Sequence, residues 1–107
     1  MFTTELTGTA LDWAVAKSKG IAFEIDLAIL IDQEIYCPSA EWSDGGPIID
    51  NYGISIEFTA IPGANWFAHI DGLFEVSADT ALMAAMRCFV FSKLGKEVEL
   101  PEGVGND

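Results

Sequence analysis

His69 and Asp71 are the two residues whose types and spacing come closest to proton-transfer chemistry. They lie two positions apart in an alternating segment, and side chains two apart on a strand share one face of a sheet. A histidine beside a carboxylate can act as a general base. The sequence places no serine or cysteine nucleophile beside them. We therefore favour a structural or solvated pair and keep a small enzyme as the alternative.

Arg87 is a second candidate, because it interrupts a segment that is otherwise almost wholly apolar. Such an arginine can hold an anionic substrate, but it more often buries its aliphatic stem and pairs with a carboxylate at the surface. The chain has 17 aspartates and glutamates from which that partner can come. We predict a structural role with a carboxylate partner.

The segment from Cys37 to Gly46 is dense in turn-forming residues, and we predict a loop there. Trp42 in a polar loop either folds back over the core or stands out as a contact for a partner. Gly45 and Gly46 permit positive φ or the close approach of another backbone. The phosphate-binding patterns GxxxxGK[ST] and GxGxxG are absent from the sequence. The candidate partner-binding residues are Trp42, Asp44, Gly45, Gly46, Pro47 and Arg87.

Acidic residues line one side of a predicted strand, where paired carboxylates can bind a hard cation. They lack the compact loop of a calcium site, and one histidine with two separated cysteines makes no zinc ligand set. We predict a solvated acidic face and neither a metal nor a cofactor. The residues of that face are Glu24, Asp26, Asp32 and Glu34.

The formal charge of −12, with only five lysines and arginines, is the dominant global property. It repels phosphate backbones, so direct binding to nucleic acid is not expected. The charge serves solubility, or it attracts a basic partner by mimicking nucleic acid. There is no apolar run of about 18 residues, so no membrane contact is predicted. Cys37 and Cys88 fit free thiols in a reducing cytosol better than one disulfide.

The elements that position these residues follow from periodicity. Thr7 to Lys19 and Thr80 to Gly95 are predicted helices, and the second has almost no polar face. Other segments must therefore cover it on more than one side. Ala10 and Ala14 of the first helix permit close packing on its stripe of small residues, which are Ala81, Ala85, Cys88 and Ser92.

Strict alternation predicts strands at Ile21 to Ile31, Gly53 to Ala60 and Trp66 to Asp71, with a brief pairing at Leu73 to Val76. Glu97 to Leu100 is a short optional strand. We predict one α+β domain spanning residues 1–107, with a frayed tail from Glu102. Its sheet is three- to four-stranded and mainly antiparallel, with two helices on one face in the order α-β-β-β-α.

Three long motifs appear in order along the chain: Leu6 to Lys17, Tyr36 to Ile49, and Ala84 to Gly95 without Phe91. With Glu97 to Pro101 they cover about half of the sequence. They resemble the NinX-like family of tailed-phage proteins, a domain family of unknown function. The resemblance implies a phage or prophage gene expressed in the bacterial cytoplasm among accessory and recombination-related genes. It assigns no catalytic residue.

We predict a phage or prophage accessory protein that acts as a non-enzymatic, acidic binding module for a host or phage protein. A concave pocket holding His69 near Trp42 and Arg87 would instead favour the small enzyme that uses His69 and Asp71. A homo-oligomeric structural component is the third alternative, because Phe67 and other outward apolar side chains can self-associate.

Overall fold

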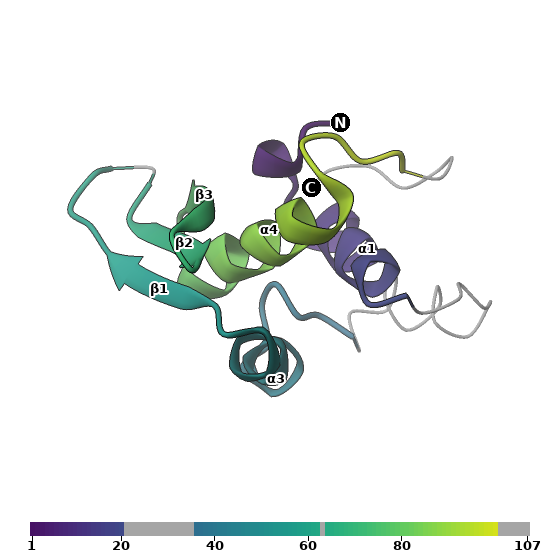
Figure 1. Cartoon of the computed structure of the whole chain (residues 1–107), viewed down its shortest axis with the longest axis horizontal. Helices are drawn as coiled ribbons and strands as arrows, with labels where there is room; N and C mark the ends of the chain where they lie inside the picture. Colours follow the sequence, from purple (N-terminus) through teal and green to yellow (C-terminus); the bar gives the residue numbers. More distant parts are fainter. Residues whose placement is uncertain (21–35, 63, 101–107) are drawn as a thin grey trace.

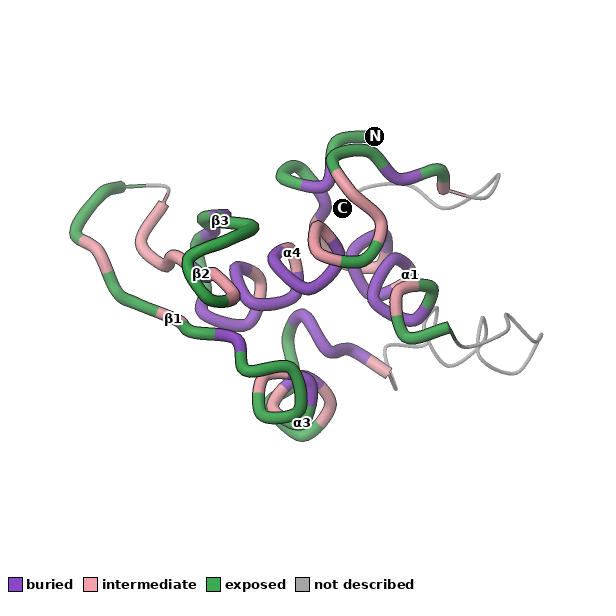
Figure 2. The backbone as a smooth tube through the Cα atoms, in the orientation of Figure 1, coloured by how far each residue is buried: buried purple, intermediate pink, exposed green. Residues whose placement is uncertain are grey.

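Helix α4, Ala81–Leu94, lies at the centre of the fold and contacts every other helix and strand that the structure describes (Figure 1). The structure is a computed structural model that describes residues 1–20, 36–62 and 64–100. Most of α4 is buried along its length (Figure 2). The prediction that this apolar helix is covered on more than one side is confirmed.

Local chemistry sets the two ends of α4. Thr80 is extended, and its Oγ1 accepts a hydrogen bond of 3.1 Å from the amide of Met83, which caps the first turn. Gly95 ends the helix at φ 84°, a conformation that glycine adopts without a Cβ penalty. Alanine, leucine and methionine between these ends favour a helix.

Three antiparallel strands form the sheet: β1 (Ser55–Phe58), β2 (Trp66–Ile70) and β3 (Leu73–Ala78). Strand β2 is central, with Ala68 facing Ile56 on one side and Val76 on the other. Ala68 and Val76 are buried, and all three strands contact α4. The predicted α+β class, with helices packed on an antiparallel sheet, is confirmed.

Helix α1, Gly8–Ser18, packs on α4 rather than directly on the strands. Its buried face includes Ala10, Leu11, Ala14 and Val15, whose spacing predicted this helix. A short 3-10 turn, η1 (Thr3–Glu5), precedes it.

The first residues of the chain pair with the segment that follows α4. Met1 and Val98 exchange backbone hydrogen bonds of 3.1 and 2.9 Å, and Phe2 forms an isolated bridge with Glu97. Thr3 Oγ1 donates to the Gly95 carbonyl at 2.6 Å. The optional strand at Glu97 to Leu100 is therefore a single bridge within the described chain.

The predicted loop at Cys37 to Gly46 is wrong from Trp42 onwards, because Trp42–Tyr52 forms helix α3. Pro47 lies inside this helix, where it donates no backbone hydrogen bond. Burial of Gly45 and Ile48 and packing on α4 offset the weak local propensity. The predicted strand at Ile21 to Ile31, the acidic residues of that region and the tail lie outside the described residues.

Cys37 and Cys88 are both buried thiols rather than a disulfide, as predicted. Burial of Cys88 within α4 raises the pKa of its thiol from 9.0 to about 11, because desolvation disfavours the thiolate. The unfolded chain ionises at the lower value. The free energy of unfolding is therefore unaffected by this group below pH 9. It falls as the pH rises from 9 towards 11, because the unfolded chain releases the Cys88 proton more readily than the folded chain does.

We expect the free energy of unfolding to fall from pH 8 to pH 10, and the Cys88→Ala variant to show a smaller fall. Urea denaturation followed by circular dichroism at both values measures the difference. Equal falls in the variant and the wild type would contradict the role given to this thiol.

Candidate functional site

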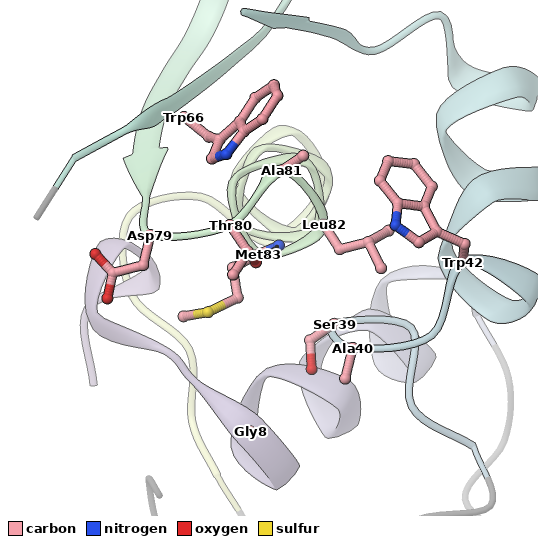
Figure 3. Close-up of a pocket in the computed structure, with 10 residues that line it drawn as sticks. All are labelled: Gly8, Ser39, Ala40, Trp42, Trp66, Asp79, Thr80, Ala81, Leu82 and Met83. Atoms are coloured by element: carbon pink, nitrogen blue, oxygen red, sulfur yellow. Dashed lines mark hydrogen bonds between the residues drawn. The ribbon is translucent and has the colours of Figure 1, made fainter. Parts of the chain in front are cut away.

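An open depression of about 620 Å³ lies where the N-terminal ends of three helices meet (Figure 3). Gly8 begins α1, Trp42 begins α3 and Ala81 begins α4. Most of the side chains that line the depression are apolar. The lining residues are Gly8, Ser39, Ala40, Trp42, Trp66, Asp79, Thr80, Ala81, Leu82 and Met83.

Two tryptophans form facing sides of this depression. Trp42 is 55% exposed, so it stands out from α3 instead of folding back over the core. Trp66 comes from β2, and its ring meets that of Phe58 edge-on at 5.2 Å between centroids. Figure 3 shows the two indoles on either side of the start of α4, with the Leu82 side chain directed towards Trp42. The aromatic surface is therefore available to a partner.

A turn at residues 37–41 leads into α3 and fixes the position of Trp42. Asp12 of α1 accepts a hydrogen bond from the Ser39 amide, and Asp44 of α3 accepts one from the Cys37 amide, both at 2.9 Å. Asp12 is only 5% exposed, so its interaction is shielded from solvent. Two carboxylates from two helices thus hold this turn.

Tyr36 lies beside the same carboxylates. Its buried hydroxyl has no hydrogen-bond partner within the part of the chain that the structure describes. Burial, followed by the charges of Asp44 and Asp12, raises the pKa of Tyr36 to about 12. The phenol therefore remains neutral across the physiological range and contributes no charge to the site.

Gly45 and Gly46 differ in what surrounds them. A Cβ at Gly45 would collide with the Pro38 carbonyl oxygen and lie 2.7 Å from Leu82 Cδ2. At Gly46 the nearest atom would be Trp42 Cε3, at 4.0 Å. Neither glycine has a positive φ. The close approach expected for this pair therefore occurs at Gly45 alone and within the chain, where α3 meets the turn and α4.

Arg87 lies outside the lining of the depression and connects separate segments of the fold. Its Nε donates to the Leu6 carbonyl at 2.8 Å, and its Nη1 donates to the Ser77 carbonyl at 2.9 Å. Among the described residues, both of these hydrogen bonds end on backbone oxygens, so Arg87 joins two segments through their carbonyl groups. Burial lowers the pKa of Arg87, and the nearby charge of Asp79 acts in the opposite direction.

His69 belongs to the hairpin between β2 and β3. Its Nδ1 accepts a hydrogen bond of 3.0 Å from the Gly72 amide, and its Nε2 lies 3.9 Å from Glu57 Oε1. Asp71 sits in the turn at φ 51°. Trp42 lines the depression, whereas His69, Asp71 and Arg87 do not, so this depression is not the pocket that would favour the small enzyme.

The remaining predicted site residues belong to α3. Asp44 stabilises the turn before the helix, and Pro47 is exposed on the helix surface. Three or more metal-ligating side chains do not gather anywhere in the described ranges. None of the helices described is both long and apolar enough to cross a membrane.

Comparison with known families decides the origin of the chain. A family model described as Bacteriophage P22, NinX matches residues 3–93. The chain belongs to this family. The matched region extends from η1 through nearly all of α4. It therefore contains every residue that lines the depression. The resemblance seen in the sequence is confirmed. Among curated proteins, none matches the chain.

The contrast between the two glycines predicts a matched pair of variants. Gly45→Ala should lower the free energy of unfolding by about 2 kcal/mol, because the added methyl group meets a backbone carbonyl. Gly46→Ala should leave it unchanged or raise it by up to about 1 kcal/mol, because alanine favours a helix. Urea denaturation of both variants tests this. Equal effects would contradict the packing described for Gly45.

Arg87→Met should lower the free energy of unfolding by about 1–2 kcal/mol, because the Leu6 and Ser77 carbonyls each lose a donor. The free energy of unfolding of Arg87→Lys should lie between those of Arg87→Met and the wild type, since an ammonium group does not reproduce the planar arrangement of guanidinium donors. Thermal and urea denaturation measure the order. If Arg87→Lys were as stable as the wild type, the two hydrogen bonds from Arg87 to the Leu6 and Ser77 carbonyls would not have the role described.

Proposed function

We propose that the chain is a non-enzymatic, acidic binding module, an accessory protein of a phage or prophage that binds a host or phage protein in the bacterial cytoplasm. One observation carries the proposal: Trp42 is more than half exposed at the edge of an open, mostly apolar depression. Tryptophan is enriched among the residues that dominate protein interfaces, where its burial contributes about 2 kcal/mol or more.

The rigidity around Trp42 supports this role. The Asp44–Cys37 hydrogen bond holds the turn before α3, and Gly45 lets the first turn of the helix pack closely on Pro38 and Leu82. An interface residue that is already held in place loses less conformational entropy when its partner binds. The surroundings of Trp42 therefore favour association.

The chemistry of the lining favours binding over catalysis. Of the described residues that form it, only Asp79 carries an acidic or basic side chain. General acid–base catalysis needs a positioned proton donor or acceptor of suitable pKa within reach of the substrate. One exposed carboxylate without a second titrating group does not make such a site.

The net charge supports a protein partner rather than a nucleic acid. A chain with a formal charge of −12 repels phosphate backbones at physiological ionic strength. The same field raises the rate at which a positively charged protein surface is encountered.

Affinity capture from lysates of phage-infected cells tests the proposal. We expect at least one protein to be retained by the wild type and to be reduced about tenfold or more by Trp42→Ala, because the variant removes the exposed indole.

Leu73→Ala is the matched control, since Leu73 is 61% exposed at the end of β3 that lies away from Ala78 and the depression. Retention that is unchanged by Trp42→Ala, or reduced equally by both variants, would contradict the proposed site.

A further inference from the structure

The one charged side chain in the lining of the depression, Asp79, is acidic. No lysine or arginine occurs between Gly20 and Met86, the part of the sequence that supplies every lining residue except Gly8. The basic residues of the chain are Lys17, Lys19, Arg87, Lys93 and Lys96. None of them lines the depression, although Arg87 is close enough to Asp79 to be affected by its charge. A partner that approaches the depression therefore meets no positively charged side chain in its lining.

One acidic residue lines the depression, and a second is adjacent to the lining residues in sequence. Asp79 lies at its edge and is exposed (Figure 3). Glu41 is also exposed, and it stands between Ala40 and Trp42, which both contribute to the lining. Asp79 precedes α4 and Glu41 precedes α3, so both carboxylates belong to segments that lead into a helix.

The interior has a different character. Leu82, Met83 and the two indoles present apolar surface, and three helix N-termini add partial positive charge at the same place. An inserted ammonium or guanidinium group would lose its hydration without gaining a paired acceptor. An apolar side chain gains from the same burial. Cationic groups of a partner are therefore favoured at the edge and disfavoured inside.

We infer that the depression binds a protein segment in which an apolar side chain is flanked by lysine or arginine. The apolar side chain enters between Trp42 and Trp66, and the flanking cations lie beside Glu41 and Asp79. The volume of about 620 Å³ is in the usual range of roughly 300–1,000 Å³ for such pockets. This inference rests on the proposed function and names the chemistry of the partner.

Other occupants fit less well. An acidic segment is repelled by the net charge, and a second copy of the chain would bring the same −12 to the contact. A basic partner without an apolar side chain would leave the exposed indole of Trp42 in contact with water. The combination of a mostly apolar interior and an acidic edge is what selects a basic segment with an apolar side chain.

Three fluorescein-labelled peptides of equal length test the inference with the full chain. The first carries leucine and phenylalanine between lysines and arginines. The second replaces the two apolar residues by alanine, and the third replaces the basic residues by glutamate. Fluorescence anisotropy at 50 mM and 300 mM NaCl measures affinity. At 50 mM NaCl we expect the first peptide to bind at least about tenfold more tightly than either of the others. Its own affinity should be lower at 300 mM than at 50 mM, because salt screens the charges.

Variants separate the two parts of the site. Trp42→Ala should weaken binding of the first peptide about tenfold at both salt concentrations. Glu41→Gln with Asp79→Asn should weaken it about fivefold at 50 mM and less than about twofold at 300 mM. Asp50→Asn with Glu75→Gln makes the same charge change at exposed positions outside the lining, and should have less than about twofold effect. Thermal unfolding confirms that each variant is folded, and Glu41→Gln alone replaces the double variant if that one is not.

Tighter binding of the glutamate peptide, equal binding of the alanine peptide, or equal losses in the two double variants would overturn the inference. If lysates yield a Trp42-dependent partner while all three peptides fail to bind, the inference falls and the proposed function stands. If no Trp42-dependent partner is captured, the proposed function falls as well.

Discussion

The burial of α4 is the constraint on which the rest of the structure depends. A helix that is apolar on nearly every side is stable only when several elements remove it from water. The sheet covers one side of α4, and α1 and α3 pack against it elsewhere. Arg87 is the polar interruption in this surface, and its guanidinium is matched by the carbonyls of Leu6 and Ser77. The same contacts join the N-terminal segment and β3 to the central helix.

This arrangement also creates the depression. Because α1, α3 and the strand end before α4 all approach the start of the central helix, their ends meet at one place. The turn at residues 37–41 is shorter than a helix and needs external partners, which Asp12 and Asp44 supply. Trp42 follows this turn directly and is 55% exposed. The site is thus a consequence of core packing.

Periodicity predicted α1, α4 and the central strand β2, because each repeats its apolar residues at the spacing of its own structure. It failed for α3, where Gly45, Gly46 and Pro47 locally favour a loop. Only tertiary contact shows that Gly45 is needed against Pro38 and Leu82. The sequence marks Trp42 as unusual because it lies in a polar segment, whereas Trp66 lies in an alternating segment that predicts only its place in a strand. Asp12 carried a readable signal: it precedes Val15 and Ala16 by three and four residues, so it lies on the buried side of α1.

The net negative charge opposes the self-association that exposed apolar side chains would otherwise favour. Trp42, Phe58 and Leu73 are each more than half exposed, which would favour self-association in a neutral protein. Mutual repulsion between chains of charge −12 opposes that contact and keeps the surface accessible. A basic partner reverses the sign of the electrostatic effect, so attraction and apolar burial then act together. Under the proposed function, charge selects which partners reach the exposed indole, and the turn at residues 37–41 holds that indole in place before a partner binds.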